Sequence, residues 1–310
     1  MIGYLLVPYI SRSGSTLLLN YLSQHQDFCV CLEADVLVKH FLQQPYTKNI
    51  NPGTQKKYVE FLAHNDAKLS NWGLKSSDIE IIASQANHLE IFLSFLNQYQ
   101  KRYCADAKIV VFKAAEIVDI LEKLKTADLQ HYSIRYLTLF RDPRACFASQ
   151  LTTIDPYSNR EMNKNPLITA YTWNKLAEKS RHFKENNPES YLELRYEDFI
   201  LNPHKILNEI AKSFATTICD LKSPKSSWLF NKIPAEQKII HHRVNFNPDP
   251  NRANAWKSKL KKTMVAIVQI ETKGYRKHLG YTDESKANTL WYIVKKYYYK
   301  FRIYFEIDQY

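Results

Sequence analysis

Tyr4-Leu-Leu-Val-Pro-Tyr-Ile-Ser-Arg-Ser-Gly-Ser-Thr-Leu-Leu-Leu-Asn-Tyr-Leu22 is the stretch of sequence that decides the fold. It begins with a short apolar run and ends with apolar residues at helical spacing, so it predicts a strand, a tight turn and the start of a helix. Gly14, one of only six glycines in the chain, lies in the turn, where the absence of a Cβ lets backbone N–H groups approach an anion. The stretch therefore predicts a phosphate-binding loop at the N-terminus of a helix.

The turn departs from the Walker A loop of ATP- and GTP-hydrolysing proteins. A Walker A loop has a glycine five residues before its second glycine and a Lys before its Ser or Thr. This chain has Tyr9 and Ser15 at those two positions. Its cation is instead Arg12, which precedes Gly14 and whose guanidinium can donate two parallel hydrogen bonds to an anion. The loop therefore argues against an ordinary nucleotide-hydrolysing site.

Length and composition indicate one domain with a single large core. The chain has 310 residues, 45% of them hydrophobic, and no linker or internal repeat divides it. The five cysteines form no CxxC pair, which is typical of a reduced compartment rather than of a disulfide framework; they are Cys29, Cys31, Cys104, Cys146 and Cys219. Because no basic and apolar leader precedes the loop strand, we expect a cytoplasmic protein.

The charge of the chain favours anionic partners. Lys and Arg number 43 and Asp and Glu 31, which gives a formal net charge of +12. Nucleotide phosphates, nucleic acid, acidic glycans and anionic membranes all fit this charge. The histidines lack the spacing of a metal site, so we expect no metal.

Five apolar, β-prone runs alternate with segments of helical periodicity, which predicts a parallel sheet with helices on both faces. The runs are Tyr4–Val7, Phe28–Leu32, Ile109–Phe112, Tyr136–Phe140 and Tyr191–Leu194. Between the second and third runs, residues 41–105 contain apolar residues at helical spacing, notably Leu89, Phe92, Leu96 and Tyr99. We interpret 41–105 as a helical insertion that shapes the substrate pocket.

A second candidate anion site follows the fourth run. The sequence Tyr136-Leu-Thr-Leu-Phe-Arg-Asp-Pro-Arg-Ala145 places Arg141 and Arg144 directly after a buried strand. A helix that begins near Pro143 would add the hydroxyl of Ser149 if the loop folds back. The alternative is an ordinary surface ion pair of Arg141 with Asp142 or Asp155.

Together, the two segments resemble the sulfotransferases that use 3′-phosphoadenosine 5′-phosphosulfate (PAPS), especially their carbohydrate and bacterial branch. Ser11-Arg-Ser-Gly-Ser-Thr-Leu-Leu18 is similar to the family's 5′-phosphosulfate loop, and Arg141-Asp-Pro-Arg-Ala-Cys-Phe-Ala-Ser149 to its 3′-phosphate motif. Leu194-Arg-Tyr-Glu-Asp-Phe-Ile-Leu-Asn-Pro203 resembles the RYEDL segment. Ala255-Trp-Lys257, with Leu279-Gly-Tyr281 further on, resembles the C-terminal signature.

The resemblance implies a P-loop-like three-layer α/β fold, with a single domain over residues 1–281 and a basic aromatic segment over 282–310. It also implies residues that hold the donor: Arg12, Ser13, Gly14, Ser15, Thr16, Leu17, Arg141, Ser149, Tyr196, Trp256 and Lys257. No metal is required by this chemistry.

Sulfuryl transfer needs a base for the acceptor and cations near the transferred group. Glu33, which ends the second run at the same sheet edge, is the expected base, with Asp35 and His40 as alternatives. Arg12 and Lys113 are the expected cations. Carbohydrate sulfotransferases often have Lys-x-x-Arg after the middle strand, whereas here Lys113 is followed by Glu116.

The expected reaction moves a sulfuryl group to a hydroxyl or amine of a glycan or small specialised metabolite, and we expect no nucleic-acid partner. One alternative is a small-molecule kinase in which Asp142 holds Mg²⁺. Another is a non-catalytic basic module that binds nucleic acid or a membrane.

The C-terminal segment interleaves aromatic residues with Lys295, Lys296, Lys300 and Arg302. Its apolar run is too short to span a bilayer. We expect a helix that packs on the domain, with contact to an anionic membrane or to a partner chain as the alternatives.

Overall fold

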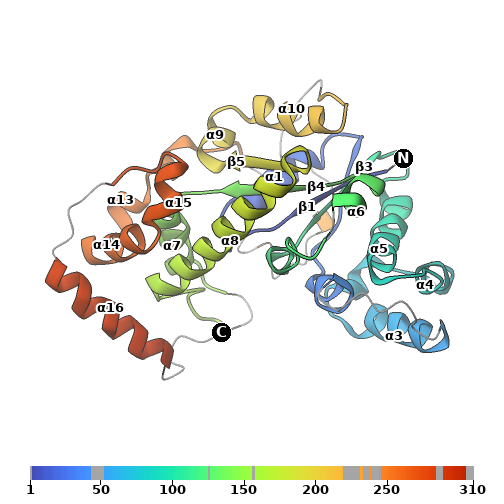
Figure 1. Ribbon diagram of the computed structural model, residues 1–310, viewed down its shortest axis with the longest axis horizontal. Coiled ribbons are helices and arrows are strands. Elements are labelled where there is room, and N and C mark those ends of the chain that lie inside the picture. Colours follow the sequence, from blue (N-terminus) through green and yellow to red (C-terminus); the bar gives the residue numbers. More distant parts are fainter. Residues whose placement is uncertain are drawn as a thin grey trace.

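A five-stranded parallel sheet forms the centre of the computed structural model (Figure 1). The structure describes residues 2–42, 52–124, 126–155, 158–218, 231–232, 238, 244, 246–283 and 289–304. The strand order is β2-β3-β1-β4-β5. The strands are β1 (Gly3–Val7), β2 (Phe28–Val30), β3 (Ile109–Lys113), β4 (Ile134–Phe140) and β5 (Tyr191–Arg195). All five predicted strands and their parallel arrangement are confirmed.

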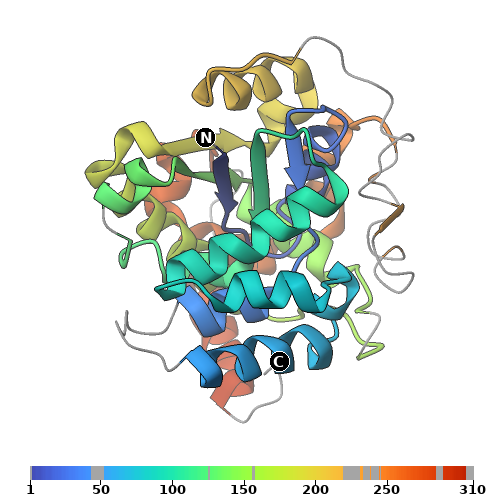
Figure 2. The same ribbon diagram turned by 90° about the vertical axis from the view of Figure 1, so that its right-hand side faces the viewer.

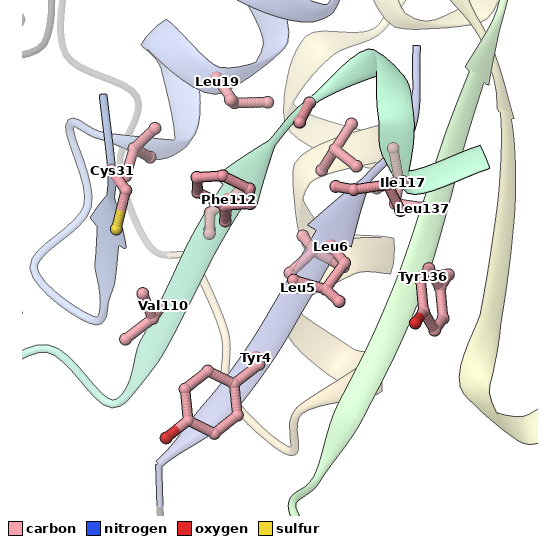
Figure 3. Packing of buried hydrophobic residues seen from close by; sticks show 14 of the residues in the cluster. Tyr4, Leu5, Leu6, Leu19, Cys31, Val110, Phe112, Ile117, Tyr136 and Leu137 are labelled. Atoms are coloured by element: carbon pink, nitrogen blue, oxygen red, sulfur yellow. The ribbon is translucent and has the colours of Figure 1, made fainter. Parts of the chain in front are cut away.

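The central strands β1, β3 and β4 are mostly apolar because both faces of the sheet are covered. Leu5 and Leu6 of β1 and Val110 and Phe112 of β3 have no exposed surface. Figure 3 shows their side chains packed with Leu19 of the helix α1 (Ser15–Leu22) and with residues of β4. Burial on both faces explains why the central strands show no regular alternation of apolar and polar residues. Because β1 pairs in parallel with both β3 and β4, the carboxyl ends of these three strands lie at one edge of the sheet.

Helices connect the strands and cover them. Apart from the helices of residues 52–103, the helices up to β5 are α1 (Ser15–Leu22), α2 (Asp35–Leu37), α6 (Thr126–His131), α7 (Pro143–Leu151) and α8 (Pro166–Asn186), with the π-helix η1 (Val38–Leu42) and the 3-10 helices η3 (Ala115–Asp119) and η4 (Pro188–Ser190). Those after β5 are α9 (Tyr196–Leu201) and α10 (Pro203–Ser213), then η7 (Pro250–Ala253), α13 (Trp256–Lys259), α14 (Lys262–Glu271), α15 (Lys273–His278) and α16 (Thr289–Tyr304). In Figure 1, α8 crosses the sheet.

The segment between β2 and β3 is helical, as predicted, over its described residues. It contains α3 (Pro52–Asn65), η2 (Leu69–Trp72), α4 (Ser76–Ala83) and α5 (His88–Tyr103), which lie together at one side of the molecule (Figure 2). The buried ring of Trp72 packs against Tyr99 and Phe112, so this segment shares its core with β3.

Cys29, Cys31 and Cys146 are buried free thiols and Cys104 is half-buried, while Cys219 lies outside the described residues. None of the helices in the described ranges is long and apolar enough to cross a membrane.

Candidate active site

The loop between β1 and α1 has an unusual backbone that brings it close to α9. Arg12 and Gly14 have left-handed φ angles of 71° and 94°. A Cβ at Gly14 would lie 2.4 Å from Cδ2 of Tyr196, the first residue of α9. Glycine is therefore required here by its φ angle and by the Tyr196 ring, a neighbour that the sequence pattern alone did not identify. The loop ends at the N-terminus of α1, where the backbone N–H groups of Ser15 and Thr16 begin the helix.

A cavity of about 570 Å³ lies against this loop. It brings together most of the residues that the sequence predicted for the site, namely Arg12, Gly14, Ser15, Thr16, Leu17, Glu33, Lys113, Arg141, Ser149, Tyr196 and Trp256. Ser13 and Lys257 are not among the lining residues. Ser13 is a buried residue of the loop, and the exposed Lys257 lies with its ammonium 5.8 Å from the Trp256 ring centre. Arg252 and Lys259, which the sequence analysis missed, do line the cavity.

Three arginines meet on one wall of the cavity. Arg12 Nε donates to Ser149 Oγ at 3.1 Å, so the α7 hydroxyl lies beside Arg12. The Arg141 guanidinium donates to the backbone oxygens of Arg12 at 3.0 Å and Arg252 at 3.2 Å, and its centre lies 4.3 Å from the Tyr196 ring centre. Arg141 Nε is buried and has no hydrogen-bond partner. These contacts hold the arginines at fixed positions in the cavity wall.

The electrostatics of this wall favour an anion. Burial, together with the positive charges of Arg141 and Arg252, lowers the pKa of Arg12 to about 10. Neighbouring guanidinium groups repel each other, and a bound anion would relieve that repulsion. The wall can therefore bind an anionic group through charge-assisted hydrogen bonds.

Arg144 does not belong to this wall, which corrects the expectation of an anion site made by Arg141 and Arg144. The Arg144 guanidinium is 2% exposed, and it donates to the Asp142 carboxylate, with Nη2 and Oδ2 2.7 Å apart, and to Gln269 at 3.0 Å. It also stacks on Trp256, at 4.1 Å from the ring centre. Asp142 accepts from the Arg144 N–H as the N-cap of α7. Arg144 and Asp142 thus join α7 to the C-terminal helices, and the suggested pair of Arg141 with Asp142 is not formed.

Glu33 and Lys113 also line the cavity, and both contact Tyr9. The Tyr9 hydroxyl donates to Glu33 Oε1, and Lys113 Nζ lies 3.6 Å from Glu33 Oε2. Lys113 Nζ also donates to Thr16 Oγ1 at 3.1 Å and lies 4.4 Å from the Tyr9 ring centre. Burial and the charge of Glu33 raise the pKa of Tyr9 well above its ordinary value, so the phenol stays protonated and donates. Lys113 therefore connects the start of α1, through Thr16, to the Glu33 carboxylate.

The two alternatives to Glu33 lie elsewhere. Asp35 forms an ion pair with Lys68, and His40 Nδ1 contacts the Tyr58 hydroxyl. Neither Asp35 nor His40 lines the cavity. Glu116, which stands where the resemblance to carbohydrate sulfotransferases leads us to expect an arginine, forms an ion pair with Lys39 at 3.2 Å.

A second cavity of about 480 Å³ adjoins the first. Tyr9, Ser11, Asp155 and Met162 line both cavities. The remaining walls come largely from η3 and α8, and they include the side chains of Val118, Ile168, Thr172 and Leu176. A molecule in the second cavity would therefore lie next to Tyr9, on which Glu33 depends for a hydrogen bond.

Two solved structures have folds similar to that of this chain. The fold is similar to the sulfotransferase domain of the Synechococcus PCC 7002 olefin synthase, with 16% sequence identity, a TM-score of 0.59, and coverage of 91% of this chain and 95% of that domain. It is similarly close to the sulfotransferase domain from the curacin biosynthetic pathway, with 17% identity, a TM-score of 0.59, and coverage of 92% and 99%. At such low identity these likenesses establish the fold. No curated protein matches the chain by sequence.

A family model described as "Sulfotransferase family" matches residues 10–220, which include the loop after β1, Glu33 and the segment Arg141–Ser149. The chain belongs to the sulfotransferase family.

Proposed function

We propose that this sulfotransferase moves a sulfuryl group from PAPS to a hydroxyl or amine of a small metabolite or glycan. The observation that carries the proposal is the meeting of Arg12, Arg141 and Arg252 in a cavity that also contains the N-terminus of α1. A donor with phosphate groups at both ends needs two separate anion sites. This cavity has a helix N-terminus and an arginine wall to supply them.

The residues present fit such a donor. Ser15, Thr16 and the first N–H groups of α1 would hold its 5′-phosphate. Arg141 would receive its 3′-phosphate, because its Nε is buried without a hydrogen-bond partner, and Ser149 with Arg12 lies beside it. Tyr196 and Trp256 line the same cavity and offer aromatic faces.

When bound, the donor supplies the activated sulfuryl group. Glu33 then takes the proton of the acceptor, and the Tyr9 phenol holds the Glu33 carboxylate through its hydrogen bond. Lys113 lies between Thr16 and Glu33, where a cation opposes negative charge that develops during transfer. The acceptor would enter from the second cavity, which meets the first at Tyr9.

The kinase alternative has less support. Its Mg²⁺ would be held by Asp142, but this carboxylate is 5% exposed and is bound to Arg144. A metal ion would have to displace a buried guanidinium. Among the described residues no group of three or more His, Cys, Asp or Glu side chains has the arrangement of a metal site.

Calorimetric titration tests the donor. We expect metal-independent binding of adenosine 3′,5′-bisphosphate, in preference to Mg²⁺-ATP. Arg141→Ala should weaken this binding by about 1.5–3 kcal/mol, the scale of a hydrogen bond to a charged group, and should remove the preference for a 3′-phosphate. Arg181→Ala is the matched control, because Arg181 forms an exposed ion pair with Glu185 on α8. Preference for Mg²⁺-ATP would support the kinase, and binding of neither would overturn the donor assignment.

A further inference from the structure

Helix α16 is attached to the domain by one of its faces. Tyr299 is 8% exposed and packs with Leu167 and Ile267. The side-chain amide of Asn165 donates to the Tyr299 backbone oxygen at 3.0 Å. One turn earlier, Lys296 forms an ion pair with Glu271 of α14 at 2.6 Å. This attached face agrees with the expectation that the C-terminal segment packs on the domain.

The opposite face of α16 is apolar and exposed. At 3.6 residues per turn, Ile293, Val294 and Tyr297 lie on the side away from Tyr299. Their exposed fractions are 43%, 51% and 67%. Phe301 and Tyr304 continue the same side, with 55% and 81% of their surface exposed. Figure 1 shows α16 at one edge of the molecule, beside α14. The exposed face is therefore a continuous apolar strip along an outer helix.

Basic side chains border this strip. Lys300 lies on one flank, with its ammonium 5.9 Å from the Tyr297 ring centre. On the other side, Tyr298 lies between the strip and the side chains of Lys295 and Arg302, whose charged groups are 5.1 Å and 5.7 Å from its ring centre. The sequence of α16 contains no Asp or Glu. The border thus carries positive charge that no carboxylate of the helix neutralises.

We propose that the exposed face of α16 binds the surface of an anionic membrane, with the helix axis parallel to the bilayer. An apolar strip bordered by Lys and Arg is the pattern of helices that lie in the interface of anionic lipids. Tyr side chains suit this location because one end of the ring is apolar and the phenol is polar. A second copy of the chain is a less suitable partner for this face, because it would bring a second set of the same positive charges to the strip and the two sets would repel each other. This proposal does not depend on the identity of the donor or the acceptor.

Co-sedimentation with vesicles tests the proposal. The intact protein should bind phosphatidylglycerol-containing vesicles and should bind pure phosphatidylcholine vesicles much less. The triple variant Ile293→Gln, Val294→Gln, Tyr297→Gln keeps the net charge and should lose most of this binding. A variant with Lys295→Gln and Lys300→Gln should bind on the order of tenfold less, because each basic residue contributes to attraction by anionic lipid.

A matched control separates α16 from the general basic charge of the protein. Phe61, Ile81 and Tyr171 are exposed apolar residues on α3, α4 and α8. Their triple replacement by Gln should leave vesicle binding unchanged. Thermal unfolding and binding of adenosine 3′,5′-bisphosphate show whether each variant is folded.

Two results would overturn the proposal. One is equal vesicle binding by the α16 triple variant and the intact protein, which would assign binding to charge elsewhere. The other is absence of vesicle binding together with a concentration-dependent dimer in analytical ultracentrifugation that the α16 variant abolishes, since the strip would then be an interface between two copies.

Discussion

At the scale of single residues, Tyr9 explains how this loop differs from a Walker A loop. The position that holds a glycine in Walker A loops here carries a phenol that donates to Glu33 and packs under the Lys113 ammonium. A glycine could do neither. The tyrosine therefore joins the loop after β1 to the candidate base. Such a connection between the anion site and a carboxylate suits group transfer to an acceptor.

Glu33→Gln tests the proposed base. The variant keeps the size and the hydrogen-bonding ability of the side chain but cannot accept the acceptor's proton. We expect turnover to fall by about 10²-fold or more, with the affinity for adenosine 3′,5′-bisphosphate nearly unchanged. Release of the bisphosphate, measured with an acceptor found by screening, reports the turnover. Glu90→Gln is the control, because Glu90 also accepts from a tyrosine, Tyr132, but does not line the cavity. Turnover retained in Glu33→Gln would exclude Glu33 as the base.

Asp35, two residues from Glu33, gives a prediction about stability and pH. Burial and the charge of Glu33 raise its pKa from 3.8 to about 6, although Lys68 opposes the shift. The folded protein therefore holds the proton of the Asp35 carboxyl more tightly than the unfolded chain does. As the pH rises from the ordinary pKa of 3.8 to about 6, Asp35 becomes ionised and this contribution to the stability of the folded protein is lost. Asp35→Asn removes the effect. We expect the free energy of unfolding of the variant, relative to the intact protein, to increase by about 1–3 kcal/mol between about pH 4 and pH 7.

Urea denaturation at the two pH values measures this difference. Asp27→Asn serves as the control, because a hydrogen bond from Thr216 lowers the pKa of Asp27 and keeps it ionised across the interval. The control should show no comparable change. A difference for Asp35→Asn that stays constant or falls with pH would contradict the assignment.

Site residues that belong to local sequence motifs could be predicted from the sequence. Residues that only the tertiary structure brings to the cavity could not. Arg12, Ser149 and Arg141 belong to recognisable segments, and they meet in the cavity. Arg252 lies in η7, far along the chain, and nothing local marks its backbone as an acceptor for Arg141. Lys259 could have been noticed, because it lies three residues after Trp256 on the same side of a helical turn, whereas Lys257 lies on another side.

At the scale of elements, strands were easier to predict than the direction of side chains at helix starts. Each strand of the buried sheet is an apolar run between polar segments, so its position follows from the sequence. Arg141 and Arg144 are three residues apart, but Arg141 precedes α7 and faces the cavity, while Arg144 lies within its first turn and points into the core. Asp142, the N-cap of α7, accounts for the different directions of the two arginines, because its carboxylate also binds the Arg144 guanidinium and keeps it in the core.

The contact between the loop and α9 predicts that Gly14→Ala is more damaging than a typical glycine substitution. Its left-handed φ costs about 1–2 kcal/mol for a residue with a Cβ, and displacement of the Tyr196 ring adds about 1–3 kcal/mol of overpacking. Gly280→Ala is the matched control, because Gly280 also has a left-handed φ, of 78°, but its nearest neighbour is Arg195 Nη1 at 3.6 Å. Urea denaturation should show a larger loss of stability for Gly14→Ala than for Gly280→Ala. Calorimetric titration should show a loss of affinity for adenosine 3′,5′-bisphosphate for Gly14→Ala and not for Gly280→Ala. Equal losses in the two variants would contradict the role of Tyr196.

At the scale of the whole molecule, two kinds of packing coexist. The helices of the insertion share the main core, since Trp72 and Phe92 both contact Phe112 of β3. Helix α16 instead rests on a small apolar cluster with Leu167 and Ile267. The amount of apolar surface buried sets how much free energy holds an element in place. The insertion should therefore unfold with the sheet, and α16 should open separately.

Native-state hydrogen exchange followed by mass spectrometry tests this division. Amides of α5 should exchange with an opening free energy close to that of β1 and β3, which report global unfolding. Amides of α16 should open with a free energy lower by about 3 kcal/mol or more, because few contacts must break. Anionic vesicles should raise the protection of α16 without changing that of α5, since a ligand stabilises only the state that it binds. Protection of α16 equal to that of β1 without vesicles would place the helix in the main cooperative unit. The sequence boundary near residue 282 would then have no counterpart in how the chain unfolds.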